Sequence, residues 1–178
     1  NQSAPTKISS PTQVGSDTIW PTEDHKIDGD GARGAVIKTD GTLWMWGKNQ
    51  YGQLGQNNTT SRSSPIQVGT DSTWKYIKVN ENGTIATKTD GTLWGWGYNV
   101  AGSLGHNNQT DYSSPVQVPG STWDHIDINW NMGMGTKTDG TLWMWGNNDN
   151  GNLGQNDNVK HSSPVQVPGT SWRGPVNA

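Results

Sequence analysis

Short apolar runs alternate with polar, glycine-rich stretches along the whole chain. In the middle of the chain, this alternation predicts three strands and a short fourth one, over 75–79, 84–88, 92–96 and 115–118. The Asp90-Gly91 pair between the second and third strands predicts a two-residue type I′ turn, because both central residues of that turn have positive φ. The pattern therefore predicts a unit of four antiparallel strands.

The third strand of this unit is apolar on both faces. It reads Leu-Trp-Gly-Trp at 93–96, and similar runs read Leu-Trp-Met-Trp at 43–46 and 142–145. A strand with one face in water alternates with polar residues, so these strands are expected to be covered on both sides. Four-stranded sheets that flank one another, as the blades of a β-propeller do, supply that geometry. The glycine-rich loops that follow carry three lone leucines, which we expect to pack between blades: Leu54, Leu104 and Leu153.

The unit recurs at a spacing of about 50 residues. Such a period indicates an array in which each copy needs a neighbour to bury its apolar face, whereas an ordinary β-sandwich predicts no such self-similarity. The phrase Thr-Asp-Gly-Thr-Leu-Trp occupies 39–44, 89–94 and 138–143, and Ser-Ser-Pro-x-Gln-Val begins at Ser9, Ser63, Ser113 and Ser162. A single tryptophan recurs at a similar spacing, at Trp20, Trp74, Trp123 and Trp172.

These repeats predict an all-β chain of about three propeller-type blades, each with four antiparallel strands, plus one extra leading strand over 9–14. We divide the sequence into an N-terminal extension, three repeats and a closing strand with the C-terminal tail, at 1–8, 9–62, 63–112, 113–161 and 162–178. Three blades are too few for a closed propeller, which has four to eight. We therefore expect the partners to be protein subunits, from the same or a neighbouring chain. Because the sequence starts at Asn1, we also expect a processed product or part of something longer.

The repeated motifs resemble those of the regulator of chromosome condensation repeat family. The resemblance rests on Thr-Asp-Gly-Thr-Leu-Trp-x-Trp-Gly, Tyr-Gly-Gln-Leu-Gly at 51–55 and Ser-Ser-Pro-x-Gln-Val. It implies blades of four antiparallel strands and, in the family, a closed seven-bladed ring. The chain looks most like the tandem form of bacterial and bacteriophage proteins. It departs from the family in its copy number and in the position before the second strand, where the family's histidine is replaced by Arg33, Gly83 and Met132.

Composition and charge exclude several classes of function. Only 29% of residues are hydrophobic and the mean hydropathy is −0.84, but eleven tryptophans supply large apolar surfaces for a core. A net charge of −3 argues against nucleic-acid binding through phosphate neutralisation. The chain has no cysteine, so disulfides and thiol chemistry are excluded and the redox compartment stays open. No apolar run is long enough to insert into a membrane.

No set of residues predicts catalysis, a metal site or a cofactor. The four histidines share no repeat position and are expected to be solvated on the surface: His25, His106, His125 and His161. Three aspartates recur, each before a glycine, where aspartate is expected for its backbone conformation: Asp40, Asp90 and Asp139. The polar loop over 147–152 lacks the acidic residues that hold calcium in an EF-hand. We expect no enzyme.

The candidate binding residues lie in the turns between the first and second strands, which differ from copy to copy. Loops on a rigid scaffold are free to carry recognition. The candidates are Asp30, Arg33, Asn80, Glu81, Asn82, Asn129, Trp130, Asn131 and Met132. Trp130 is the one tryptophan outside the repeat register, and it suits stacking on a sugar or anchoring a protein partner. The alternative is a drifted turn in which Trp130 packs locally.

The sequence favours a non-catalytic structural or interaction module on an extracellular or virion surface, such as a component of a phage tail, fibre or capsid decoration. This step is an analogy, because a fold does not decide function. One alternative is a carbohydrate-binding propeller that recognises surface glycans, which predicts equivalent residues in every copy. The other is a nucleotide-exchange or chromatin-binding factor, which calls for a complete ring and a basic contact surface.

Overall fold

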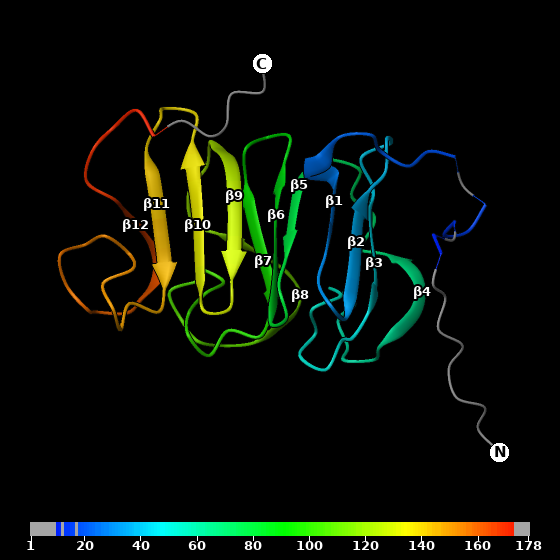
Figure 1. The fold of residues 1–178 in the computed structure, drawn as a ribbon, viewed down its shortest axis with the longest axis horizontal. Coiled ribbons are helices and arrows are strands. Elements are labelled where there is room, and N and C mark those ends of the chain that lie inside the picture. Colours follow the sequence, from blue (N-terminus) through cyan, green and yellow to red (C-terminus); the bar gives the residue numbers. More distant parts are fainter. Residues whose placement is uncertain (1–9, 12, 17, 173–178) are drawn as a thin grey trace.

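Three antiparallel four-stranded sheets stand side by side in a row (Figure 1). The computed structural model describes residues 10, 11, 13–16 and 18–172. Each sheet has its strands in sequence order, from β1-β2-β3-β4 in the first blade to β9-β10-β11-β12 in the third. One short 3-10 helix, η1 (Asp24–Lys26), precedes β1. The all-β blades and their four-strand order are confirmed, and the three sheets form an open row.

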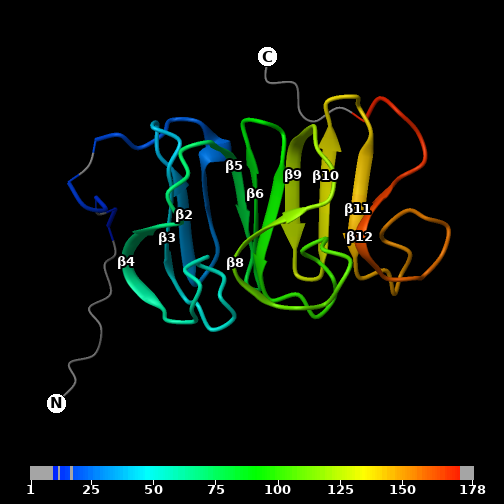
Figure 2. The same ribbon diagram turned by 180° about the vertical axis from the view of Figure 1, so that it is seen from behind.

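The strands fall close to the predicted ranges. Blade 1 contains β1 (Ile27–Gly29), β2 (Arg33–Ile37), β3 (Leu43–Gly47) and β4 (Arg62–Gln67). Blade 2 contains β5 (Trp74–Val79), β6 (Gly83–Lys88), β7 (Leu93–Gly97) and β8 (Tyr112–Val118). Blade 3 contains β9 (Trp123–Asn129), β10 (Met132–Lys137), β11 (Leu142–Gly146) and β12 (His161–Gln166). The view from behind follows the fourth strands, β4, β8 and β12 (Figure 2). Strand β8 begins three residues before the predicted 115, because Tyr112 pairs with Gly97 across a register shift.

The predicted type I′ turn is wrong. The Lys88 amide donates to the Thr92 carbonyl at 2.9 Å, which closes a loop of three residues, 89–91. The Gly91 amide donates to the Lys88 carbonyl at 3.0 Å. Within this loop only Gly91 has a positive φ, at 79°. This is a turn over 88–91 followed by a left-handed glycine, the usual geometry of a three-residue hairpin loop. Asp90 therefore has no need of a positive φ.

The recurring aspartate is used for its side chain rather than for its backbone conformation. In blade 2, Asp90 Oδ1 accepts hydrogen bonds from the amide and the hydroxyl of Thr92, and Thr92 Oγ1 accepts one from Trp94 Nε1 at 2.9 Å. Lys88 Nζ lies 3.9 Å from the centre of the Trp94 ring. The same arrangement occurs in the other blades around Trp44 and Trp143. The motif Thr-Asp-Gly-Thr-Leu-Trp thus forms the same hairpin between the second and third strands in all three blades. We call this end of a blade the hairpin end.

The core lies between blades, as the two-faced third strands predict. Leu54 of blade 1 is fully buried in one cluster with Trp74 and Trp96 of blade 2. Leu104 is likewise buried with Trp123 and Trp145 at the next boundary. The prediction of a leucine between blades is therefore confirmed at both boundaries. Leu153 is also buried, but the described chain places no blade after it.

The two tryptophans of each third strand differ in burial. Trp96 and Trp145 are fully buried, and their indole nitrogens donate to the backbone carbonyls of Gln53 and Ser103 in the preceding blade. Trp94 and Trp143, two residues earlier, are only half-buried. Because residues two positions apart share a face, both tryptophans lie on the side of the preceding blade, and only the one nearer the end of the strand is fully covered. On the opposite face Leu43, Met45 and Leu93 are fully buried by the following blade.

The predicted leading strand is not formed by the described residues of its segment. Ser10, Pro11, Gln13 and Val14 belong to none of the three sheets, and Ser9 and Thr12 lie outside the described residues. In each other copy this motif pairs with the third strand that precedes it in the sequence. The leading copy has no such strand before it in this sequence, so the ladder that would make it a strand is missing. In the described chain, no helix has the length and apolarity to cross a membrane.

Candidate functional site

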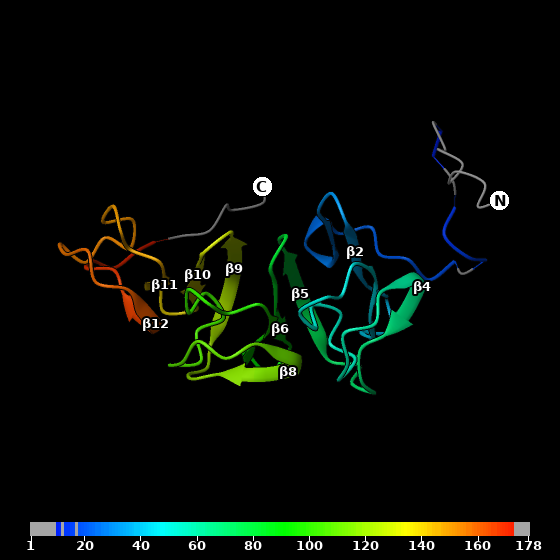
Figure 3. The same cartoon turned by 90° about the horizontal axis from the view of Figure 1, so that it is seen from below.

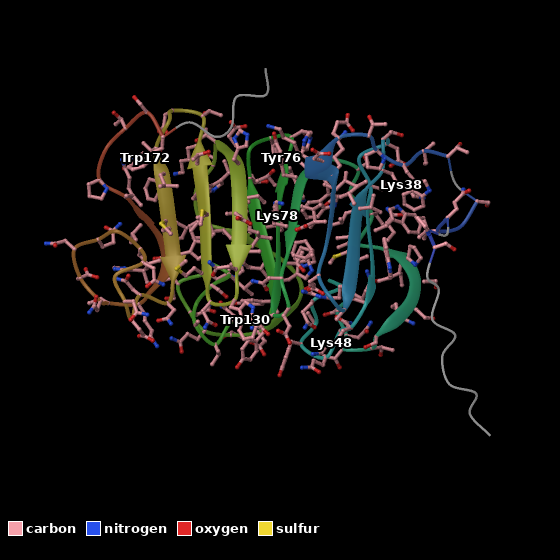
Figure 4. All side chains as sticks on the ribbon, in the orientation of Figure 1. Lys38, Lys48, Tyr76, Lys78, Trp130 and Trp172 are labelled. Carbon is pink, nitrogen blue, oxygen red and sulfur yellow. The ribbon has the colours of Figure 1, made fainter. Side chains whose placement is uncertain are left out.

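The three turns between first and second strands gather at one end of the row of blades. Antiparallel sheets stacked in the same orientation bring equivalent turns to the same end, so residues about 50 positions apart in sequence become neighbours. Figure 4 shows Trp130 at this lower rim, while Tyr76 and Trp172 lie toward the opposite one. We call residues 30–32, 80–82 and 129–131 the turn face.

Each turn is shaped by its own first residue. Asp30 Oδ1 accepts hydrogen bonds from the amides of Ala32 and Arg33, at 2.7 and 2.9 Å. Asn80 Oδ1 does the same for Asn82 and Gly83. Asn129 Oδ1 accepts one from the Met132 amide at 3.2 Å. Aspartate and asparagine are suited to this role because a short side chain can mimic the backbone of a turn.

Hydrogen bonds also join each turn to the next. Asn80 Nδ2 donates to the Asn129 carbonyl, and Asn82 Nδ2 donates to the Trp130 carbonyl at 3.5 Å. On the other side, Asp28 Oδ2 accepts from the Val79 amide at 2.8 Å. The turns therefore form a connected surface whose shape depends on the stacking of the blades.

A groove of about 600 Å³ runs between the three turns. Val79 and Ile128, the buried ends of β5 and β9, line it with apolar surface. Asn80 and Asn129 contribute amides. The remaining lining comes from the candidates Asp30, Glu81 and Trp130, together with Gly31 and Ala32. Sequence reasoning missed Val79 and Ile128, although their place at the end of an alternating strand marks them as inward-facing.

Trp130 dominates the exposed surface of this groove. Its side chain is 67% exposed, whereas the in-register Trp74 and Trp123 are 3% and 1% exposed. A large aromatic side chain in water is a common feature of recognition surfaces. The alternative that Trp130 packs locally in a drifted turn does not hold for its side chain.

Arg33 is not available for recognition. Its side chain is fully buried and pairs with Asp30 Oδ2 at 2.7 Å. Its guanidinium also reaches Thr84 Oγ1 and the Gly83 carbonyl in blade 2, at 3.4 and 3.5 Å. Burial lowers the pKa of Arg33 below its ordinary value, while Asp30 opposes that shift. Arg33 therefore joins two blades beneath the turn face, which corrects its assignment as a surface contact.

Two further candidates lie beside the groove rather than in it. The Asn131 carbonyl accepts a hydrogen bond from the Asn147 amide at 2.8 Å. Met132 Sδ accepts one from Asn152 Nδ2 at 3.0 Å. Both contacts turn toward the long loop of blade 3, away from the groove. The structure thus gathers Asp30, Asn80, Glu81, Asn129 and Trp130 in the groove, with Asn82 beside them.

A second hollow, of about 420 Å³, lies along the first strands, and no motif in the sequence pointed to it. It is lined in part by three rings from three blades, which we call the ring ladder: His25, Tyr76 and His125. The ring centroids of His25 and Tyr76 are 4.3 Å apart, and those of Tyr76 and His125 are 5.6 Å apart. His25 is one position out of register with the other two, so motif alignment does not bring it to the ladder.

The histidines are not solvated surface residues as expected. All four are partly buried. Burial lowers the pKa of His25 and of His106, which favours the neutral ring at neutral pH. His106 bonds the Val116 carbonyl at 2.9 Å, in the place where blades 1 and 3 use Gln56 and Gln155. Across the residues that the structure describes, no three potential ligands converge to hold a metal ion.

Comparison with known proteins identifies the repeats. The sequence profile named "Regulator of chromosome condensation (RCC1) repeat" matches residues 40–86, 90–126 and 139–176, more than half of the chain. The chain belongs to the RCC1 repeat family. This confirms the resemblance drawn from the motifs, while the likeness to the tandem bacteriophage form stays a prediction. A comparison with curated protein sequences finds no match.

Three solved structures share the arrangement of blades. The crystal structure of human WBSCR16 superposes with a TM-score of 0.75 at 21% identity, over 89% of this chain and 43% of that one. Prp20p from Saccharomyces cerevisiae gives a TM-score of 0.71 at 16% identity, over 82% of this chain and 38% of that one. Yeast RCC1 bound to Kap60 gives 0.70 at 15% identity, over 82% and 37%. This chain therefore spans about two fifths of the length of these neighbours, and at such identities the likeness concerns the fold alone.

Proposed function

We propose that this chain is a non-catalytic interaction module that binds a protein partner through its turn face. The observation that carries the proposal is the convergence of three dissimilar turns on one groove with an exposed tryptophan, above a scaffold that repeats itself. Scaffold residues recur because the same packing recurs, whereas a surface used for recognition is free to differ between copies. Prp20p, which shares the fold, has binding properties toward Gsp1p and histones, and this supports a protein partner in general without identifying one.

The chemistry of the groove favours a peptide segment that carries an apolar side chain beside a basic one. Val79, Ile128 and the Trp130 ring offer apolar contact. Glu81 is exposed at the rim and adds negative charge, while the carboxylate of Asp30 is already paired with Arg33. Tryptophan is enriched among residues that dominate interface energies. Trp130 is accordingly the anchor of the proposed site, and Glu81 selects charge.

A surface glycan is the second candidate ligand. Trp130 is exposed, and Asn82 donates to its backbone carbonyl, so an aromatic face and an amide lie close together as sugar binding requires. The other two turns have no aromatic residue at the matching place. A lectin with one site per blade would repeat its site residues in every turn. The glycan alternative therefore concerns one sugar site, at Trp130.

An exchange or chromatin factor has weaker support. The chain covers 38% of Prp20p and shares 16% of its residues. Its net charge is −3, which disfavours a phosphate-binding surface. We further propose an extracellular or virion location, supported by the polar composition and the near-identical copies. Mass spectrometry of purified particles against cell fractions tests that location, and recovery only in cell interiors contradicts it.

A displayed random-peptide library, selected on the purified wild-type chain, tests the protein-binding function. Selected peptides are expected to combine apolar and basic residues and to lose at least about tenfold in affinity on Trp130→Ala. Val159→Ala is the control, because Val159 is also an exposed apolar residue and does not line the groove. Glu81→Lys is expected to weaken the basic peptides only.

A glycan array probed with the same variants separates the two ligand classes. Glycan binding that depends on Trp130, without any selected peptide, favours the carbohydrate alternative. Peptides that bind Trp130→Ala as well as wild type contradict the turn face as the site.

A further inference from the structure

The two boundaries between blades are built from the same contacts. Where blade 1 meets blade 2, Trp96 Nε1 donates to the Gln53 carbonyl at 2.8 Å, and the Asn57 amide donates to the Ser113 carbonyl at 2.7 Å. Where blade 2 meets blade 3, Trp145 Nε1 donates to the Ser103 carbonyl at 2.7 Å, and the Asn107 amide donates to the Ser162 carbonyl at 2.7 Å. The boundary is therefore a unit that repeats. One half is the long loop that follows the third strand of a blade, which we call the donor loop, and the other half is the next blade.

The outer face of blade 3 carries the donor-loop half of this unit. Leu142 and Met144 are partly exposed there, while their counterparts Leu43 and Met45 in blade 1 are fully buried by blade 2. Val167 is likewise partly exposed. The same apolar positions therefore recur, and they differ in burial because the described chain ends its row of blades here. Figure 3 shows the sheet of blade 3 at the end of that row.

The loop of blade 3 already has the shape that an incoming blade requires. Asn156 has a φ of 59°, close to the 55° and 58° of Asn57 and Asn107, whose amides bond the next blade. Gly52 is so close to blade 2 that a Cβ there would lie 2.3 Å from Ser113 Cα. Gly151, at the matching place, also has a left-handed φ, of 73°, but a Cβ there would meet only its own loop, at 3.5 Å from Asn158 Oδ1 and 3.8 Å from the Asp157 carbonyl oxygen.

Trp172 marks the place where a further blade would begin. Its amide donates to the Gly140 carbonyl at 2.9 Å, as the Trp123 amide does to Gly91. Yet Trp172 is 42% exposed while Trp123 is 1% exposed. The Trp123 ring lies 5.7 Å from the ring of Trp145, the third-strand tryptophan of the same blade. Among the described residues, no third-strand tryptophan lies beside Trp172. The matching place in blade 1 is filled by its own Trp20, whose ring centre is 5.1 Å from Lys38 Nζ.

Blade 1 exposes the other half of the boundary, the surface that blades 2 and 3 present to the blade before them. Trp46 is the counterpart of Trp96 and Trp145, and it is only half-buried where they are fully buried. Ser63 is the counterpart of Ser113 and Ser162, and it is exposed. A surface on blade 1 and a complementary surface on blade 3 therefore lie at opposite ends of one chain.

The geometry points to a second copy of this chain as the occupant, with its blade 1 docked on the outer face of blade 3. The indole nitrogen of Trp46 from one copy donates to the Asn152 carbonyl of the other. The Asn156 amide donates to the Ser63 carbonyl. Because the two surfaces differ, the contact is head-to-tail and generates a ring if the rotation closes. Two copies give six blades, within the four to eight of closed propellers.

Sedimentation equilibrium of the full chain tests this assembly over about a hundredfold range of micromolar concentrations. Wild type is expected to approach twice the monomer mass of 19.3 kDa. Met144→Asp adds a charge to the outer face of blade 3 and is expected to raise the dissociation constant at least tenfold, about 1.4 kcal/mol. Val159→Asp is the matched control, because Val159 is exposed and its counterparts Thr60 and Thr110 stay exposed even where a blade follows. Circular dichroism establishes that each variant is folded.

A mixing experiment distinguishes the head-to-tail contact from any other dimer. Met144→Asp keeps an intact blade 1 surface, and Trp46→Ala keeps an intact blade 3 surface. Each variant alone is expected to be monomeric, while an equal mixture forms a heterodimer through its one remaining good interface. A monomeric wild type across the range overturns the proposal, as does a Met144→Asp protein that dimerises like wild type. Neither result bears on Trp130 and the turn face, so the two proposals fail separately.

Discussion

The hairpin end of each blade carries the same residues in all three copies, whereas the turn end carries different ones. At the hairpin end the side-chain interactions stay within one blade, from aspartate to threonine to tryptophan, with a lysine over the ring. At the turn end they cross between blades, as when Arg33 reaches Thr84 or Asn80 reaches Asn129. The chain therefore repeats the hairpin end and the loop contacts between blades, and varies the contacts between neighbouring turns.

This contrast shows which residues of a repeat protein can differ between copies. A contact inside one blade has to be provided again in every copy, so its residues recur. A contact between neighbouring turns can use a different pair at each boundary, as long as each pair is complementary. The turn face owes its asymmetry, with one exposed tryptophan among three turns, to this freedom.

The largest expected effect is at the tryptophan nearer the turn end of β7. Trp96→Ala should lower the free energy of unfolding by about 3–5 kcal/mol, because a fully buried indole leaves a cavity between blades. Trp94→Ala, at the half-buried hairpin-end position, should lose about half as much. Urea denaturation of both variants measures the difference. Equal losses would mean that the boundary between blades contributes no more than the hairpin end.

The ion pair beneath the turn face ranks next. Arg33→Ala should cost about 3 kcal/mol, because it leaves the Asp30 carboxylate near a buried site without its partner. Arg33→Lys is the matched control: it keeps the charge but loses the second contact of the guanidinium, so it should recover part of the loss. Thermal and urea unfolding provide the measurement. A neutral Arg33→Ala would return this residue to the surface and contradict the burial.

A smaller effect is expected at the hairpin end, and it depends on pH. Hydrogen bonds from Thr42, Thr92 and Thr141 hold the pKa of Asp40, Asp90 and Asp139 below the ordinary aspartate value. A carboxylate with a lowered folded-state pKa stabilises the fold above its unfolded pKa, about 3.9, and that contribution is lost as pH falls through the folded value. The matched variant is the triple replacement of these threonines by valine.

The triple valine variant should melt below wild type near neutral pH, and the gap in Tm should narrow as pH falls below about 4. Melting curves followed by circular dichroism from neutral to strongly acidic pH measure this. A gap that does not change with pH would mean that the aspartates contribute nothing through their charge.

The smallest effect on stability is expected at the most exposed tryptophan. Trp130→Ala should change the free energy of unfolding by less than about 0.5 kcal/mol, because its side chain is largely in water. Its effect should appear in binding instead. If Trp130→Ala destabilises the fold as Trp96→Ala does, the turn face is core and the contrast between the two ends is lost.

Much of the fold could be predicted from the sequence because the array repeats local patterns. Period-two alternation located the strands to within a residue or two, except for β8, and third strands apolar on both faces required neighbouring blades. The errors came from single residues. Asp90 was assigned a positive φ from a two-residue turn, although the loop has three residues and only Gly91 needs that conformation.

The candidate site was predictable only in part. Differences between aligned copies led to the turns, and five of the nine candidates line the groove. The burial of Arg33 could not be read from the sequence, because it depends on Asp30 within its own blade and on Thr84 in the next one. The ring ladder was missed for a related reason, since His25 meets Tyr76 across a boundary between blades and out of register.

By itself, the sequence determined the repeating unit: its strands, its glycine-dependent hairpin loop and the apolar positions that call for a neighbour. These features depend on residues close together in the chain, so alternation and motif spacing are enough to find them. The tertiary structure alone decided which residues of different blades meet, which tryptophans are covered and which polar groups remain at the surface. Those outcomes depend on the stacking of whole sheets, where one blade supplies the donor and its neighbour the acceptor, and no single repeat contains both.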